Sequence, residues 1–108
     1  MARYLIQASY SQQGTSDMVK NPHDRAASVR PVLERMGGRV ETFYFALGDF
    51  DIVAIFEVPD NVSATALAMA IGASGALKDY KTTVLISMDE AVEAMRKAGT
   101  IGYQPPGG

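Results

Sequence analysis

The chain has 108 residues and a mass of 11.6 kDa, which is the size of a single domain. Apolar residues make up 47% of it and charged residues 20%, so the composition excludes a chain that is disordered throughout and indicates an ordinary globular protein. The net charge is −2 and the basic residues are spread along the chain. We therefore expect no nucleic-acid partner, because a polyanion gains little electrostatic attraction here.

Other kinds of chemistry are excluded by missing residues and motifs. The absence of cysteine excludes disulfides, thiolate metal sites and thiol nucleophiles, and it makes the cytoplasm the expected location. A single histidine makes a zinc site implausible, and no glycine-rich phosphate motif or nucleophile elbow occurs, so we expect no metal and no cofactor. The longest apolar run, residues 64–71, is far shorter than the roughly 20 residues that span a bilayer, so no membrane association is expected.

The chain is predicted to begin with a strand followed by a long loop. Residues 3–10 alternate between apolar and polar side chains, as a half-buried strand does. Residues 11–21 are mostly polar and include Gly14, which favours a loop.

A helix is predicted over residues 22–36. Asn21 provides an N-cap, Pro22 suits the first helical position, and Gly37 lies where a left-handed stop is expected. Pro31 is the misfit, because in mid-helix it removes one backbone hydrogen bond and crowds the preceding turn. We therefore expect a kink at this proline or a helix in two pieces.

The middle of the chain is predicted to form a hairpin and a second helix. Residues 39–47 and 51–58 alternate strongly and are joined by a turn over 48–50. Asp60 or Asn61 then caps an alanine-rich helix that extends to about residue 73.

The last part of the chain is predicted to form a strand over 81–88, an amphipathic helix over 89–98 and a Gly/Pro-rich tail over 99–108. The resulting order, β-α-β-β-α-β plus a helix, predicts an α+β, ferredoxin-like domain over residues 1–98. Its four-stranded sheet should be antiparallel, with the first and third strands in the middle.

The two faces of the predicted sheet differ in character. The face of mixed composition combines Val53 and Ile55 with Glu57 and Thr83, which is too apolar for a solvated surface. We expect a second copy of the chain to cover it in a homodimer; the alternative is a monomer with a mildly apolar outer face. The other face is apolar and should lie under the two long helices: Phe43, Phe45, Leu47, Ile52, Ala54, Phe56, Val58, Val84, Ile86 and Met88.

The stretch from Arg35-Met-Gly-Gly-Arg-Val to Leu47-Gly-Asp-Phe-Asp-Ile-Val-Ala-Ile-Phe-Glu-Val-Pro-Asp, followed by Lys81-Thr-Thr-Val-Leu, resembles the GYD domain family. The resemblance implies the architecture of the dimeric α/β-barrel superfamily, in which ferredoxin-like protomers join sheet to sheet. It leaves the activity open, because relatives in that superfamily include cofactor-free monooxygenases, lactone isomerases, haem enzymes and ligand sensors. The family's Gly-x-Tyr-Asp segment reads Gly48-Asp49-Phe50-Asp51 here, so any role of a phenol at position 50 is lost.

One end of the predicted domain gathers most of the chemically varied side chains. The first strand ends there, the first helix begins, the central hairpin turns and the last strand begins. We expect a ligand pocket to open at this end, with ligand contacts from Tyr10, Tyr44, Asp49, Phe50 and Tyr80.

Three side chains are candidates for proton transfer in such a pocket. His23 lies in the first turn of a helix, whose dipole favours a neutral imidazole that can act as a base; the alternative is a solvated surface histidine. Asp51 is either a general base or a carboxylate that braces the hairpin. Lys81 either stabilises an anionic group or forms an ion pair across the mouth.

The leading functional hypothesis is a homodimer that binds a small, largely apolar organic molecule and acts as a cofactor-free isomerase or lyase. The alternative is a non-catalytic module that senses a ligand or holds an assembly together. In either case the tail around Ile101 and Tyr103 is expected to pack on the neighbouring protomer.

Overall fold

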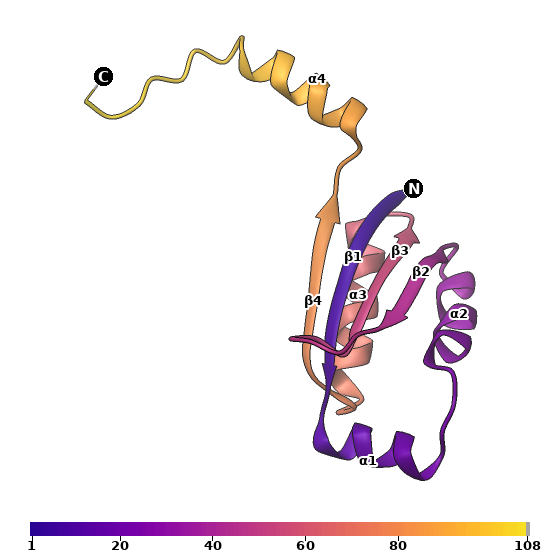
Figure 1. The fold of residues 1–108 in the computed structure, drawn as a ribbon. Coiled ribbons are helices and arrows are strands. Elements are labelled where there is room, and N and C mark those ends of the chain that lie inside the picture. The colour runs from indigo at the N-terminus through magenta and orange to yellow at the C-terminus, as the bar shows by residue number, and fades with distance from the viewer. Residues whose placement is uncertain (108) are drawn as a thin grey trace.

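The computed structural model describes residues 1–107 and contains four strands and four helices (Figure 1). In chain order these are β1 (Ala2–Tyr10), α1 (Gln12–Lys20), α2 (Arg25–Arg35), β2 (Arg39–Phe45), β3 (Ile52–Val58), α3 (Asn61–Ala73), β4 (Leu77–Leu85) and α4 (Met88–Ala98).

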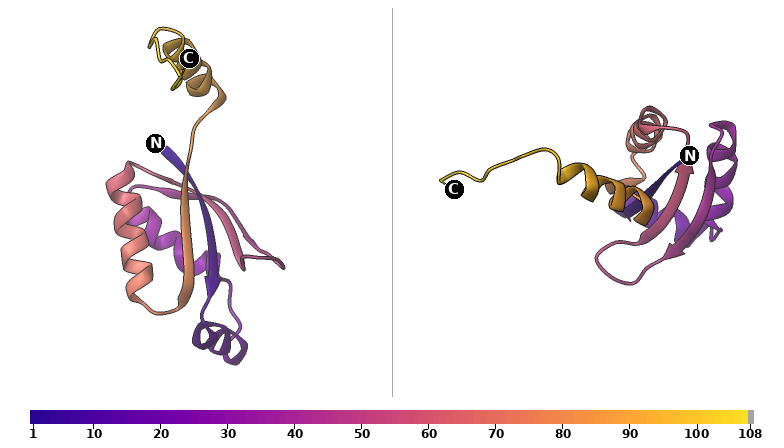
Figure 2. Two further views of the ribbon diagram at one scale, coloured as in Figure 1. Left: turned by 90° about the vertical axis from the view of Figure 1, so that its left-hand side faces the viewer. Right: turned by 90° about the horizontal axis from the view of Figure 1, so that it is seen from above.

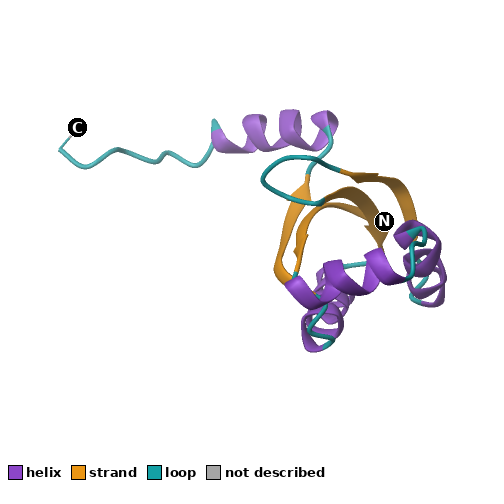
Figure 3. Ribbon diagram, turned by 60° about the horizontal axis from the view of Figure 1, so that its bottom comes forward, coloured by secondary structure: helices purple, strands orange, loops and turns teal. Residues whose placement is uncertain are grey.

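The four strands form one antiparallel sheet in the order β2-β3-β1-β4. The α+β, ferredoxin-like fold is confirmed, and so is the placement of the first and third strands in the middle of the sheet. Two irregularities bend the ladder: one lies between Val40 and Thr42 in β2, and the other leaves Lys78 of β4 unpaired opposite Ser9 and Tyr10 of β1. Such bulges increase local twist, and the sheet is visibly curved in cross-section (Figure 3).

Helices α2 and α3 lie on the same face of the sheet, as two views show (Figures 2 and 3). Alternate residues of β1 and β3 point toward them, because successive strand side chains face opposite sides. Leu33 of α2 is fully buried and packs in one cluster with these strand residues. The cluster forms the core of the domain: Tyr4, Ile6, Ala8, Tyr10, Leu33, Ile52, Ala54, Phe56, Val58, Ala64 and Leu67.

The segment predicted as a loop over residues 11–21 contains helix α1, so that prediction was wrong. Ser11 caps the helix, since its side chain accepts the backbone N–H of Gly14 at 3.0 Å. None of the residues of α1 is buried, and its composition is polar. Met18 and Val19 are the only large apolar residues of α1, so no apolar stripe runs along the helix by which it could be recognised.

Helix α2 begins later than predicted, at Arg25 in place of Pro22. Asp24 is the N-cap, and its carboxylate accepts the backbone N–H groups of Ala26 and Ala27 at 2.9 and 3.4 Å. Pro31 lies inside a helix that continues to Arg35, so the helix is not divided in two.

The last strand lies earlier in the chain than predicted. It starts at Leu77 and ends at Leu85, where residues 81–88 were expected. Ser87 then caps α4 in a reciprocal arrangement: its hydroxyl accepts the N–H of Glu90, and the Glu90 carboxylate accepts the N–H of Ser87. This capping box starts the helix at Met88 and ends the extended chain.

Helix α4 and the tail project away from the rest of the domain (Figures 1 and 2). The molecule consequently measures 59 × 34 × 23 Å. Several residues that the strand parity placed under the long helices are exposed, because α2 and α3 do not extend over the hairpin tip or the end of β4: Phe45, Leu47, Val84, Ile86 and Met88.

Candidate functional site

A cavity of about 300 Å³ lies between the helices α2 and α3 and the face of the sheet that they cover. Its volume falls at the lower end of the range for small-molecule sites. The sheet contributes residues that are apolar apart from two phenols: Ile6, Ala8, Tyr10, Phe43, Ile52, Phe56, Leu77 and Tyr80.

The helices and the α3–β4 connection form the rest of the wall. Several of these residues are small, which leaves the space unfilled: Ser28, Ala70, Ser74 and Ala76. The larger lining residues of this part are aliphatic apart from Arg25: Arg25, Val29, Val32, Leu67 and Ile71.

Arg25 opens helix α2 and brings a positive charge to the cavity wall. Its Nη1 donates to Nε2 of His23 at 3.1 Å, while Nδ1 of His23 donates to the carbonyl of Asn21 at 2.7 Å. These partners assign the neutral tautomer with the proton on Nδ1. The Nε of Arg25 is buried and has no hydrogen-bond partner among residues 1–107.

Tyr80 projects from β4 toward the helices, because it pairs with the buried Ala8 of β1. Its hydroxyl is also buried without a hydrogen-bond partner in the described part of the chain. Burial raises the pKa of Tyr80 to about 12, and the nearby Thr82 side chain opposes this only in part. The group is therefore a neutral hydrogen-bond donor over the whole physiological range.

Tyr10 lies at the end of β1 and lines the same cavity. Burial raises its pKa above the usual range, while a hydrogen bond with the side chain of Arg25 and the positive charge of that arginine act in the opposite direction. Its ring stacks on Phe45, with the centroids 6.3 Å apart. Of the five predicted ligand contacts, Tyr10 and Tyr80 line the cavity.

The other predicted contacts lie outside the cavity wall. Tyr44 faces away from the helices and is exposed, because it pairs with Val53 on the outer face. Phe50 is half-buried in the hairpin connection, and Asp49 is exposed there, where its backbone carbonyl accepts the hydroxyl of Ser9 at 3.4 Å.

The three predicted proton-transfer residues are not brought together. The Asp51 carboxylate accepts the backbone N–H of Tyr10 at 3.0 Å, which is the bracing alternative for this residue. Lys81 is exposed on β4 and belongs to the outer face, since it pairs with Gln7. His23 contacts the cavity only through Arg25.

Arg25 was missed by the sequence interpretation, although the sequence carries a signal for it. A cation in the first turn of a helix opposes the helix dipole, so it is unfavourable unless something else requires it. Asp24 is a favourable N-cap, whereas the positive charge of Arg25 in the first turn is unfavourable. Because the N-cap was predicted at Asn21, Arg25 was not recognised as a first-turn residue.

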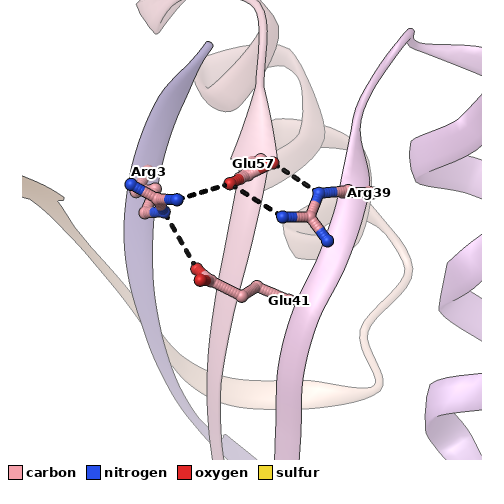
Figure 4. A network of polar contacts seen from close by, with 4 residues as sticks. All are labelled: Arg3, Arg39, Glu41 and Glu57. Carbon is pink, nitrogen blue, oxygen red and sulfur yellow. Dashed lines mark hydrogen bonds and ion pairs between the residues drawn. The ribbon is translucent and has the colours of Figure 1, made fainter.

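The outer face of the sheet has a charged cluster at one end (Figure 4). Glu57 is 8% exposed and accepts Nε of Arg39 at 2.6 Å, and its other oxygen lies 3.1 Å from Nη2 of Arg3. Arg3 also binds Glu41 at 3.1 Å. The hydrogen bond from Arg39 lowers the pKa of Glu57 despite the opposing effect of burial.

Within residues 1–107, no group of three or more histidine or carboxylate side chains is arranged to hold a metal ion. The helices of this same part are also too short or too polar to cross a bilayer.

The lining side chains offer apolar surface and hydrogen-bond donors, and they include no carboxylate and no imidazole. The cavity is thus suited to holding a molecule, whereas a proton-accepting group near neutral pH is not part of its wall.

Comparisons with known proteins agree with the fold. The GYD domain matches residues 4–95. A curated relative, the "Glutamine synthetase and cystathionine beta-lyase binding protein" of Thermus thermophilus, is 29% identical over 79 residues, covering 72% of this chain and 82% of that protein. No solved structure gives a significant match. Because the matched region spans most of the chain, this protein belongs to the GYD domain family.

Proposed function

We propose that this protein binds a small, largely apolar organic molecule in the cavity between the sheet and helices α2 and α3. The observation that carries the proposal is a partly open pocket of about 300 Å³ between the sheet and the helices, walled mainly by aliphatic and aromatic side chains. A concave apolar surface of this size leaves hydrophobic side chains in contact with water, which is unfavourable unless a ligand covers them.

Binding without catalysis is the version that the geometry supports best. An isomerase or lyase needs a base within hydrogen-bond reach of the substrate. The candidate bases are engaged elsewhere: Asp51 holds the N–H of Tyr10, and Nε2 of His23 accepts from Arg25.

Fluorescence titration with the neutral probe N-phenyl-1-naphthylamine tests the proposal. We expect saturable binding with one site per chain. Val29 lines the cavity, so Val29→Phe should fill it and weaken binding at least about 10-fold, as loss of roughly 1.4 kcal/mol would. Ala27→Phe adds the same ring to an exposed position of the same helix and should bind as the parent does. Absence of saturable binding, or equal binding by both variants, would refute the proposal.

A second candidate function, self-association, rests on a different observation. Helix α4 is amphipathic and projects from the domain with its apolar residues uncovered, and Tyr103 beyond it is 77% exposed. Half-buried aliphatic side chains also occupy the outer face of the sheet, among them Leu5, Val53 and Ile55. Two copies that cover both surfaces would form the homodimer predicted from the sequence. The relative from Thermus thermophilus is named for binding other proteins, which agrees with a role in assembly.

Sedimentation equilibrium at micromolar concentration distinguishes the two states. We expect a mass of about twice 11.6 kDa. Met95→Asp places a charge on the apolar side of α4 and should shift the equilibrium toward monomer, while Glu93→Gln on its polar side should not. A parent protein that sediments as a monomer would exclude this second function and leave ligand binding untouched.

A further inference from the structure

We infer that the bound molecule carries a carboxylate or another oxyanion that pairs with Arg25, and a second oxygen that accepts from Tyr80. This inference rests on the proposed ligand site. Its basis is the pair of buried donors in the wall, Nε of Arg25 and Oη of Tyr80, that find no acceptor among residues 1–107.

A buried donor without an acceptor costs free energy, and nearly all such groups are satisfied in folded proteins. Two of them in one apolar cavity indicate that the missing acceptors belong to a ligand. Oxygen atoms are the acceptors that a guanidinium and a phenol share.

The charge of Arg25 decides the character of the first acceptor. Every ion pair found in the described residues joins Arg3 or Arg39 to Glu41 or Glu57 on the outer face, and none includes Arg25. Asp24, its neighbour, uses its carboxylate to cap the helix. The guanidinium therefore meets the cavity with the neutral imidazole of His23 and the phenol of Tyr10 as its hydrogen-bonded side-chain partners, and an anionic ligand group would supply the missing negative charge.

The remaining wall determines the rest of the ligand. Apart from Arg25, Tyr10, Tyr80 and two serines, the lining is apolar, so the molecule must be mainly hydrocarbon with its oxygen atoms at a few positions. A small carboxylic acid with an aromatic or branched aliphatic body fits this description, whereas a sugar or a nucleotide does not.

A matched pair of probes separates the anionic group from the apolar body. Calorimetric titration compares 4-phenylbutyrate with 4-phenylbutanamide, which has the same body and no charge. We expect the acid to bind about 10- to 100-fold more tightly, as charge-assisted hydrogen bonds do. Arg25→Met should reduce this ratio to below about 3, and Arg25→Lys should retain part of it. Arg30→Met removes an exposed arginine outside the cavity wall on the same helix and should leave the ratio unchanged.

Tyr80→Phe tests the second oxygen. Both probes carry a carbonyl-type acceptor, so the variant should weaken both, by about 2- to 10-fold for one neutral hydrogen bond.

The outcomes distinguish the inference from the function on which it rests. If the neutral naphthylamine binds and the acid and amide bind equally, the cavity is a ligand site and the inference of an anionic group is wrong. If none of the three probes binds, both fail. If Arg25→Met still binds the acid more tightly than the amide, the inference is also wrong. If Arg25→Met does not fold, the ratio of acid to amide affinity in Arg25→Lys is compared with the ratio in the parent protein, and an unreduced ratio also contradicts the inference.

Discussion

The side chains of Arg25 and His23 are joined by a 3.1 Å hydrogen bond from Nη1 of the arginine to Nε2 of the histidine. The histidine is itself held by its bond to the carbonyl of Asn21. The chain just before helix α2 thus fixes the guanidinium at the wall of the cavity. We propose on this basis that His23 positions Arg25.

Replacing His23 by alanine should weaken the binding of 4-phenylbutyrate by about 3- to 10-fold, because a freed guanidinium must be ordered again on binding. Binding of the neutral amide should not change, which a purely structural effect would not predict. His23→Gln keeps an acceptor on the side chain and should restore part of the affinity. Calorimetric titration of both probes with each variant provides the measurement, and equal losses for acid and amide would contradict the positioning role.

Replacing Asp51 by alanine should destabilise the fold by about 1–3 kcal/mol, because the part-buried N–H of Tyr10 loses its acceptor. Asp51→Asn retains an oxygen and should cost less. Asp49→Ala is the matched control, because this carboxylate is exposed and makes no hydrogen bond or ion pair among residues 1–107. Urea denaturation measures all three, and an unchanged midpoint for Asp51→Ala would show that the brace contributes nothing.

The stability of the protein should fall as the pH rises from about 10 toward 12, because the pKa of Tyr80 is raised to about 12 in the folded state. Between these values the unfolded chain gains free energy by ionising this phenol while the folded chain does not. Tyr80→Phe should make the alkaline decline less steep. Tyr103→Phe, at an exposed position, should follow the parent curve in urea denaturation at each pH.

At the acidic end, Glu57 should control part of the loss of stability. Arg39 holds its pKa below the usual range, so its contribution is complete above the unfolded pKa and is lost as the pH falls through the folded value. Glu57→Gln should lower the urea midpoint at neutral pH and flatten the curve below pH ~4.5. Glu34→Gln on the exposed surface of α2 should leave the acidic decline intact. A parent-like acid profile in Glu57→Gln would refute this assignment.

The spacing of apolar residues predicted the number and order of the strands correctly, but it placed the start and end of β4 wrongly. The alternation in β1 and β3 identified two strands because one face of each is buried, and β2 alternates in the sequence although its residues are at most half-buried. Most residues of β4 are exposed, and the start of the strand pairs through the irregularity at Ser9 and Tyr10, so Lys78 and Asp79 near its start interrupt the alternation. Helix α1 was missed for a related reason, since it buries no residue completely.

The cavity could not be predicted from residue spacing. Its volume depends on how side chains from four strands and two helices meet, and small residues such as Ala70 and Ala76 leave space only in that arrangement. Topology alone predicts a pocket at the end of the domain where Tyr10 lies. Side-chain rotamers and the positions of helix caps determine which neighbouring side chains reach the interior. Because the start of α2 was predicted wrongly, Arg25 was not recognised as a residue of the cavity wall.

Helix α1 contributes no residue to the cavity wall, but it contacts the α3–β4 connection that forms part of that wall. The hydroxyl of Ser11 donates to the carbonyls of Gly75 and Ala76 at 3.1 Å each, and the backbone N–H of Ser11 donates to Ala76 at 2.9 Å. Gly14 lies so close to the carbonyl of Ala76 that any side chain there would collide with it. A larger residue at position 14 would therefore displace the carbonyl of Ala76 and change the shape of the cavity wall, although no residue of α1 lines the cavity.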